Sequence, residues 1–557
     1  MDVREVIYKH TLKNALEFGK AKEKAILGKV LAELPEYRKR VKEIIPIINE
    51  VVKEVNSYPR ERIEEEIKKY EFIKVERKKE ALPDLKVKDK VVLRFAPNPS
   101  GPLHLGHSRA AILNDEYAKR YKGKLILRLE DTDPSRVYPP AYEMIKEDLE
   151  WLEVKIHETH IQSERLEIYY NYAEKLISAG NAYVCTCSQE EFKKLRDAKK
   201  QCKCRGLSTE ENLERFEKMF SEYKEGQAVV RIKTDLALPD PSMRDFPIMR
   251  ICETPHPRVG EKRVYPLYNF AVTIDDYLMK VTHVLRGKDH IANTRKQSII
   301  YDYFSWQKPE FIHYGRLSIG GVTLSTSKIM EGIKSKSYAG WDDIRLGTLR
   351  ALAKRGIQAK AIRKAMLEIG VKESDIDFSW ENLYAYNKDI IEPIANRYFF
   401  VWEPKKLVIK NAPSFEAQPL LHPNFPERGR RKIKIEAKEG KAEVFISSTD
   451  AESIKEGEFL RLMEAFNIII LKKSNEIFAE YHSQTLEEAR KRKAKLIHWL
   501  SGESLPVKVI THEKIFKGLG EENLKNLKEG DIIQFERFGF VRIDKINKEI
   551  IAYFTHK

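Results

Sequence analysis

Two histidines flank a Leu-Gly pair in the segment RFAPNPSGPLHLGH, residues 94–107. An apolar run precedes it and a predicted helix through Tyr121 follows it, so a strand passes into a helix here. The start of a helix offers unpaired N–H groups and a positive dipole end, which suit a polyphosphate. His104 and His107 can donate to phosphate oxygens as charge develops, and Gly106 permits close approach to the backbone. The alternative is a strand–helix turn with surface histidines.

The elements around this segment predict a parallel nucleotide-binding sheet. VVLRFA (91–96) and LILRLED (125–131) are predicted strands joined by the loop and helix above, which makes a β-loop-α-β unit. Further apolar strands are expected around YNFAVTIDDYLM (268–279) and HVLRG (283–287). No Gly-Lys pair has an upstream glycine at the spacing of a Walker loop, which excludes that type of phosphate site.

Four cysteines form a second constellation, as two close pairs separated by fourteen residues: Cys185, Cys187, Cys202 and Cys204. Two thiolate pairs can supply a tetrahedral zinc site, and four protein ligands would make that metal structural. The alternative is four reduced thiols in a segment whose metal site has degenerated. Cys252 stands alone and is expected to be a small buried residue.

The regions on either side of this central part have a different spacing of apolar residues. Residues 1–72 show apolar positions at helical spacing, and a polar segment at 78–90 separates them from the first strand. Residues 341–370 are also predicted to be helical. From about residue 396, short alternating runs separated by turn residues predict β-barrels.

Length and composition limit the function classes. A chain of 557 residues is too long for one core, so several domains are expected. Its net charge of +16 favours a polyanionic partner. Five cysteines do not form a disulfide framework, the opening segment lacks an apolar signal core, and no apolar stretch could span a bilayer. We therefore expect a cytoplasmic protein with no membrane association.

The segment 94–107, followed by LRLEDTDPSR (127–136), resembles the first signature of class I glutamyl- and glutaminyl-tRNA synthetases. RLSIGGVTLSTSKI (316–329) lies where that family has a flexible loop of the form Met-Ser-Lys-x-Lys. Here the loop begins at Leu324, and Thr326 replaces the central lysine, which leaves Lys328 as its cation. The resemblance implies catalytic roles for His104, Gly106, His107 and Lys328, and binding of Mg-ATP by Pro97, Asn98, Pro99, Gly101, His104, Gly106, His107, Ser325, Thr326, Ser327 and Lys328.

A glutamate pocket needs cations for two carboxylates and an acid for the ammonium group. Arg94 and Arg286 supply guanidinium groups and Glu130 a carboxylate. The resemblance assigns the amino acid to the same side chains, in the set Arg94, Ala96, Asn98, Glu130, Tyr268 and Arg286. It makes Arg286 the residue that selects glutamate over glutamine, whereas Val272 departs from a polar family position. The alternative is ordinary ion pairing, for example of Arg94 with Asp131.

The C-terminal third carries the rest of the resemblance. IIEPIANRYFFV (390–401) and HPNFPERGRRKIKI (422–435) are similar to the β-barrel anticodon-binding region of archaeal glutamyl enzymes and of glutaminyl enzymes. The run Arg428, Arg430, Arg431 and Lys432 is a candidate for tracking tRNA phosphates, with a solvated charged face as the alternative.

The resemblance implies a multidomain chain around a Rossmann-type class I α/β catalytic fold. The expected order is an N-terminal helical appendage (1–87), the first half of the catalytic fold (88–175), an inserted acceptor-stem-binding domain with the four cysteines (176–265), the second half of the catalytic fold (266–335), a helical stem-contact domain (336–395) and β-barrel anticodon-binding domains (396–557).

The implied activity is attachment of L-glutamate to tRNA(Glu) through a glutamyl-adenylate, and tRNA(Gln) is left open as a second substrate. Three rivals remain: a glutaminyl-tRNA synthetase, a small-molecule nucleotidyltransferase and a non-catalytic tRNA-binding relative. Arg286 argues against a glutaminyl-tRNA synthetase, and the C-terminal barrels argue against a small-molecule nucleotidyltransferase. The intact pocket residues oppose the third, which Thr326 nevertheless keeps open.

Overall fold

The structure is a computed structural model that describes residues 2–34, 36–37, 40–70, 82–87, 90–474, 476–502 and 504–557. The chain divides into two compact units, Met1–Glu80 and Ala81–Lys557. The predicted polar segment at 78–90 lies partly outside the described residues. No described helix has the length and apolar character needed to cross a membrane.

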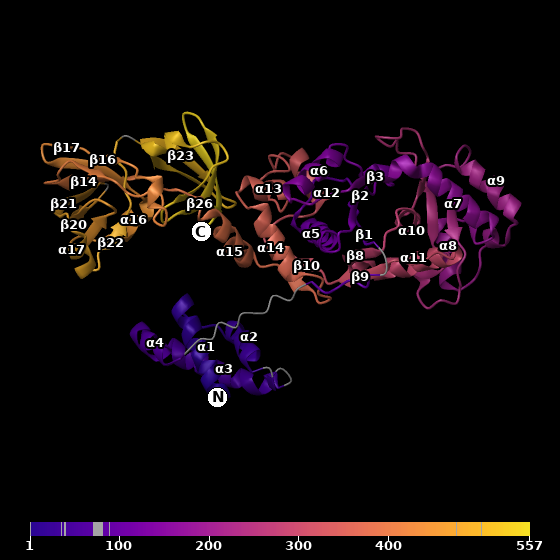
Figure 1. Ribbon diagram of the computed structural model, residues 1–557, viewed down its shortest axis with the longest axis horizontal. Coiled ribbons are helices and arrows are strands. Elements are labelled where there is room, and N and C mark those ends of the chain that lie inside the picture. The colour runs from indigo at the N-terminus through magenta and orange to yellow at the C-terminus, as the bar shows by residue number, and fades with distance from the viewer. Residues whose placement is uncertain are drawn as a thin grey trace. The chain divides into compact units, whose positions relative to one another are not determined.

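The first unit is helical, as the periodicity predicts. Its helices are α1 (Val3–Phe18), α2 (Glu23–Glu33), α3 (Val41–Asn56) and α4 (Arg60–Glu66) (Figure 1). Asp2 caps α1 by accepting from the N–H of Arg4. The apolar face of α3 is buried through Ile44, Ile48 and Val51, and it packs in a core of its own with α1 and α2. This unit therefore has a hydrophobic core independent of the second one.

The second unit begins with a parallel α/β arrangement. β1 (Val92–Phe95) pairs in parallel with β2 (Lys124–Leu129), which pairs with β3 (Glu158–Ile161). β8 (His283–Gly287) pairs in parallel with β9 (Glu310–Tyr314), and the N–H of Thr282 donates to Val92 O beside β1. The connecting helices are α5 (Leu105–Arg120), α6 (Ala141–Trp151), α10 (Tyr268–Leu278) and α11 (Ile291–Tyr303). This architecture confirms the β-loop-α-β unit around the histidine segment.

The prediction of a strand at 268–279 is wrong, because this segment forms α10. Its apolar residues Phe270, Ala271 and Ile274 are spaced for one helical face and are buried together. Asp275 and Asp276 are buried as well, and both carboxylates bind arginines. Apolar and buried acidic side chains together give a nearly continuous buried run, which resembles a core strand in sequence.

Between β3 and α10 the chain forms a separate layer of helices and antiparallel strands. The helices are α7 (Leu166–Ser178), α8 (Gln189–Asp197) and α9 (Thr209–Met219). The four-stranded sheet follows the order β4 (Ala182–Cys185), β5 (Val229–Ile232), β6 (Pro247–Ile251) and β7 (Val264–Pro266). The two cysteine pairs therefore lie at the end of β4 and around the short helix η5 (Lys203–Gly206).

After β9 come short elements and helices: β10 (Leu317–Ser318), α12 (Thr326–Lys334), α13 (Leu349–Lys354), α14 (Ala359–Ile369), β11 (Ile376–Asp377) and α15 (Trp380–Ile391). The segment predicted as a flexible lysine loop is thus ordered into the first turn of α12 from Thr326 onward. Ser325 is its N-cap residue. The prediction of helices in 341–370 agrees with α13 and α14.

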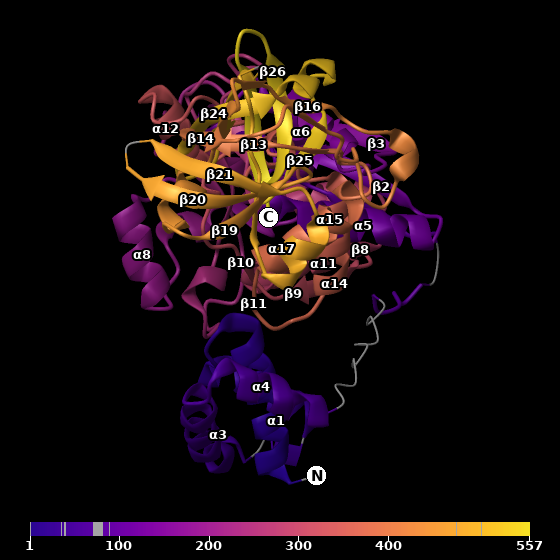
Figure 2. The ribbon, with the colours of Figure 1, turned by 90° about the vertical axis from the view of Figure 1, so that its left-hand side faces the viewer.

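The C-terminal region is built from two seven-stranded sheets and the short pair β15 (Phe415–Ala417) and β16 (Ile433–Ile435). One sheet has the order β17 (Ala437–Lys438), β18 (Lys441–Ile446), β14 (Lys405–Lys410), β21 (Ile477–Ser483), β20 (Asn467–Lys473), β19 (Phe459–Leu462) and β22 (Lys495–Ile497). Figure 2 shows β19, β20 and β21 side by side, and α16 (Ser448–Ser453) and α17 (Leu486–Lys491) accompany this sheet.

The second sheet brings together segments that are distant in sequence. Its order is β12 (Arg397–Tyr398), β25 (Ile532–Phe535), β26 (Gly539–Ile546), β27 (Ile550–His556), β23 (Ser504–Ile510), β24 (Ile515–Glu521) and β13 (Phe400–Trp402). The short alternating runs that begin near residue 396 therefore mark a real change from helices to strands.

Candidate active site

A cavity of about 550 Å³ opens at the carboxyl ends of β1, β2 and β8, the edge where parallel α/β sheets bind ligands. All six residues predicted to hold the amino acid line it: Arg94, Ala96, Asn98, Glu130, Tyr268 and Arg286. Of the predicted nucleotide-binding residues, Pro97, Asn98 and His107 also belong to its lining. The structure thus brings together side chains from four separate segments of the chain.

Arg94 lies in a buried ion-pair cluster beneath this cavity. Its Nε is 3.5 Å from Asp276 Oδ1, so the alternative pairing with Asp131 is not observed. Asp131 instead accepts from Ser163 and Tyr142. Arg128 is fully buried and donates to Asp276 Oδ1 at 2.7 Å. Asp276 therefore serves two guanidinium groups at once, one of which faces the cavity.

Arg286 is anchored on one side only. Its Nη2 donates to Thr294 Oγ1 at 2.6 Å and to Gln297 Oε1 at 2.8 Å, both on α11. Within the described residues, its Nε and Nη1 are buried without a hydrogen-bond partner. Burial lowers the pKa of this guanidinium. Because a buried unpaired donor is unfavourable, these two nitrogens point to an acidic ligand.

The opposite charge is supplied by Glu130, directly after β2. Its Oε1 accepts from Arg128 Nη2 at 3.0 Å, and Asn98 Nδ2 donates to its backbone carbonyl at 2.8 Å. Burial raises the pKa of Glu130, while Arg128 and Arg94 act in the other direction. A carboxylate beside Arg94 and Arg286 gives the cavity the mixed charge that a zwitterionic amino acid with an acidic side chain requires.

The two signature histidines begin α5 and stack with ring centroids 3.7 Å apart. His104 Nδ1 accepts from the N–H of Gly106 at 3.1 Å, and His107 Nδ1 accepts from the N–H of His104 at 3.3 Å. Burial lowers the pKa of His104 to about 4 and that of His107 well below its usual value. Both rings are therefore neutral and carry their proton on Nε2, where it can be donated to a phosphate.

Gly106 is required by the fold of this turn. A Cβ at this position would lie 2.9 Å from His104 Cε1, because the imidazole folds back over the glycine. The N–H of Leu105 donates to Gly347 O, and the N–H of Gly347 donates to Thr323 O. Gly347 is thus hydrogen-bonded both to the histidine turn and to the segment before α12.

The lysine segment also contacts the Pro/Gly-rich loop. A Cβ on Gly101 would lie 2.7 Å from Thr326 Cγ2 and 2.8 Å from Trp341 Cη2, so Thr326 packs closely on this glycine. Lys328 is exposed. Ser325 and Ser327 are exposed too. None of the residues 325–328 belongs to the cavity lining described above.

Sequence reasoning missed several residues of this site. Arg128 and Asp276 form the buried support of Arg94, a role that the sequence did not indicate for either residue. Arg250, on β6, lines the cavity and pairs with Asp133 at 2.9 Å, which brings the inserted layer to the site. Arg136 also lines this cavity. Arg128, Asp133 and Arg136 all lie within the segment LRLEDTDPSR, whereas Arg250 and Asp276 lie in none of the quoted signature motifs.

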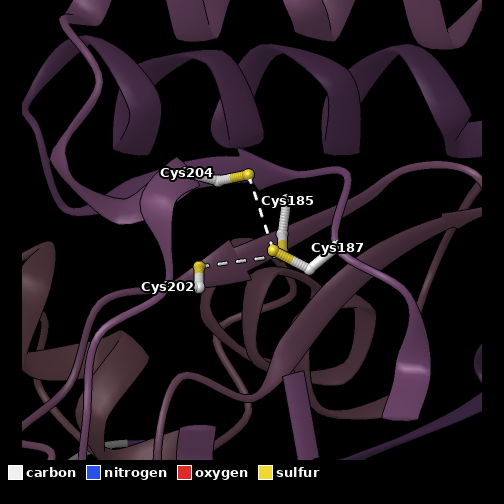
Figure 3. Close-up of side chains that lie close together, drawn as sticks. All are labelled: Cys185, Cys187, Cys202 and Cys204. Carbon is white, nitrogen blue, oxygen red and sulfur yellow. Dashed lines mark hydrogen bonds between the residues drawn. The ribbon is translucent and has the colours of Figure 1, made fainter. Parts of the chain in front are cut away.

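The four cysteines meet at one place (Figure 3). Their sulfur atoms point toward one another and all lie within 4.8 Å, and the four side chains are buried. The Cys185–Cys202 and Cys187–Cys204 sulfur distances are both 3.9 Å. A disulfide needs about 2.05 Å, whereas a tetrahedral zinc with 2.3 Å bonds separates its sulfurs by about 3.8 Å. The donor set therefore fits zinc.

The prediction that Arg431 tracks RNA phosphates is wrong. This side chain is fully buried and forms ion pairs with Glu521 and Glu536. The other three residues differ in exposure. Arg428 is half-buried and donates to Pro393 O, while Arg430 and Lys432 are exposed. The run is therefore not a single basic face.

Comparison with known proteins agrees with this geometry. The tRNA synthetases class I (E and Q) match through their catalytic domain at residues 90–393 and through their anticodon-binding domains at 395–484 and 496–544. The glutamate–tRNA ligases of Methanocaldococcus jannaschii and Pyrococcus furiosus are each 51% identical, over the full length of both chains. A crystal structure of a glutamate tRNA ligase from Elizabethkingia meningosepticum in complex with its amino acid is 25% identical, with a TM-score of 0.40, and covers 55% of this chain and 71% of its own. By its sequence and by its matched domains, this chain belongs to the class I tRNA synthetases of the E and Q family.

Proposed function

We propose that this chain attaches glutamate to tRNA in an ATP-dependent reaction through a glutamyl-adenylate. The observation that carries the choice of amino acid is Arg286, whose Nε and Nη1 lie buried in the cavity wall without a partner among the described residues. A side-chain carboxylate would accept from both nitrogens, whereas a carboxamide would present an N–H₂ group to one of them. Full-length similarity to glutamate–tRNA ligases supports the same choice.

The rest of the pocket orients the same substrate. Arg94 faces the cavity as the second guanidinium, and Glu130 is the acid available to the ammonium group. With glutamate held in this way, its α-carboxylate attacks the α-phosphorus of ATP and pyrophosphate departs. The terminal ribose hydroxyl of tRNA then takes the glutamyl group and AMP departs. Neither step needs a protein nucleophile, so catalysis consists of positioning and electrostatic stabilisation.

The nucleotide is assigned to residues of the histidine segment (94–107) and of the lysine-containing loop (324–328). The Nε2–H groups of His104 and His107 donate to phosphate oxygens, and the exposed Lys328 adds a positive charge from α12. Thr326 occupies the position of the missing lysine and packs on Gly101, so its role is to hold α12 against the loop. Mg²⁺ would accompany the triphosphate.

The remaining domains are assigned to tRNA. The inserted layer between β3 and α10 would hold the acceptor end, α13 to α15 would contact the stem, and the two C-terminal sheets would read the anticodon as β-barrel domains. Arg430 and Lys432 remain candidates for phosphate contacts because they are exposed. In the inserted layer, Cys185, Cys187, Cys202 and Cys204 would bind a structural zinc with no open position.

The decisive experiment is aminoacylation with labelled glutamate and, separately, labelled glutamine. Charging by glutamate alone supports the proposal, and charging by glutamine would transfer the chain to the glutaminyl enzymes. Charging by neither amino acid would favour a tRNA-binding relative. Thr326→Lys would then be the first substitution to test. Nothing in the described residues supports tRNA(Gln) as a substrate, so purified tRNA(Glu) and tRNA(Gln) form separate arms.

A further inference from the structure

The four cysteines differ in what donates to their sulfur atoms. Cys204 Sγ accepts from the backbone N–H of Thr186 at 3.5 Å and from Arg215 Nη1 at 3.6 Å. Cys202 instead lies 3.7 Å from Tyr183 Oη, whose proton is committed to Asp245 at 2.9 Å. Among the described residues, Cys204 is the ligand with a hydrogen bond from a charged side chain.

Arg215 is held in place for this contact. It lies on α9, where its Nη2 donates to Glu211 Oε1 one turn earlier at 3.1 Å. Ser208 caps the same helix by accepting from the N–H of Glu211. One edge of the guanidinium is thus fixed by a carboxylate and another faces the sulfur. The arrangement joins α9 to the η5 segment through a single side chain.

Four thiolates around a divalent metal carry a net charge of −2, and burial makes that charge unfavourable. A hydrogen bond from a cation disperses part of it and fixes the direction of the sulfur. We propose that Arg215 is a positioning residue of the four-cysteine metal site, where its bond to Cys204 slows the loss of the metal. This inference rests on the proposed zinc site and not on the aminoacylation activity.

The test measures release of zinc from the purified full-length protein into excess colorimetric chelator. Arg215→Met removes the donor and keeps the aliphatic volume, and it should release zinc about ten times faster than the unchanged protein. Arg215→Lys keeps the charge but loses the planar fork, so it should be intermediate. Lys218→Met is the matched control, because Lys218 also forms an i,i+4 pair on α9, with Glu214, and has no bond to a cysteine.

Each outcome decides a separate point. Equal release rates in the unchanged protein and Arg215→Met would overturn the role of Arg215 while leaving the zinc site intact. Equal acceleration in Lys218→Met would also overturn it, because general weakening of α9 would then be the cause. A preparation that binds neither zinc nor cobalt at these sulfurs would overturn the metal site itself. Glutamate and tRNA are absent from the assay, so its result is independent of charging.

Discussion

Gln297 holds Arg286 by one nitrogen, with Oε1 at 2.8 Å from Nη2, and leaves Nε and Nη1 without a hydrogen-bond partner among the described residues. Thr294 accepts from the same nitrogen, so the two partners fix the guanidinium without using up the edge that faces the cavity. The ring of Phe311 lies 5.0 Å from the guanidinium carbon and limits its movement. If Arg286 selects glutamate as we propose, that selectivity depends on support from α11 as well as on Arg286 itself.

Replacing Arg286 with Gln should raise the KM for glutamate and lower kcat/KM by about 100-fold, equivalent to about 3 kcal/mol. The side-chain carboxylate of the substrate would enter the same pocket without its charged partner. Steady-state aminoacylation at varied glutamate concentration measures the change. Arg263→Gln is the control, since Arg263 is a half-buried arginine that pairs with Glu253 and lies outside the cavity lining. An unchanged KM in Arg286→Gln would remove this residue from the pocket.

Asp276→Asn should lower the stability of the second unit by about 3–5 kcal/mol. The substitution leaves Arg128 fully buried with one counter-charge fewer and removes the ion pair that supports Arg94. Thermal unfolding followed by circular dichroism measures the loss. Asp302→Asn, which breaks an exposed pair with Lys308, should have little effect. If both variants melt alike, the buried cluster does not stabilise the fold.

Gly101→Ala should reduce kcat at least tenfold while the KM for glutamate stays close to its original value. The new methyl group would collide with Thr326 and with the rigid ring of Trp341, and would therefore displace the start of α12 and Lys328 with it. Gly502→Ala, at a glycine with open space around it, is the control. A normal kcat in Gly101→Ala would show that the position of α12 is unimportant for catalysis.

Acid should destabilise the C-terminal region through His498. This residue is fully buried, accepts from Arg537 on Nδ1 and donates to Phe400 O, so the ring is neutral. Burial, aided by Arg537, lowers its pKa to about 4, whereas an unfolded histidine titrates near 6.5. The unfolded chain alone therefore takes up a proton between these values. Stability is present above about pH 6.5 and is lost as the pH falls toward 4.

The loss from His498 amounts to about 2 kcal/mol at pH 5. Thermal midpoints at pH 7.5 and pH 5 measure it, and a His498→Gln variant should show a smaller difference between the two. If the variant retains the full pH dependence, other groups cause it.

The meeting of the six candidate residues at one cavity was predictable because most of them belong to short motifs at strand ends. Arg94 lies near the end of β1, Asn98 follows β1 and Glu130 follows β2. The apolar runs indicate both strands, and parallel topology brings such ends together. Arg128 lies in the same motif, two residues before Glu130, but nothing in the motif indicates that it supports Arg94. Its role depends on Asp276, which lies far along the chain in a segment whose helix was missed.

Charge patterns were less informative than motifs. Arg430, Arg431 and Lys432 are consecutive, yet the middle residue is buried between Glu521 and Glu536 while its neighbours are exposed. Along a β-strand or an extended segment, alternate side chains face opposite sides, and sequence alone does not tell which side is inward. The acidic partners lie at the end of β24 and directly after β25, and no local pattern connects these positions to Arg431.

The order of strands in the second C-terminal sheet has a consequence for synthesis. Tyr398 pairs with Phe535 and Phe400 with Gly520, so the two strands that start this region find their partners only in its later part. A nascent chain must therefore carry β12 and β13 as unpaired, aromatic-rich edges while the intervening sheet forms. Such non-local pairing is slow and exposes surfaces prone to association. This sheet therefore cannot be completed until the late strands β24 and β25 have left the ribosome.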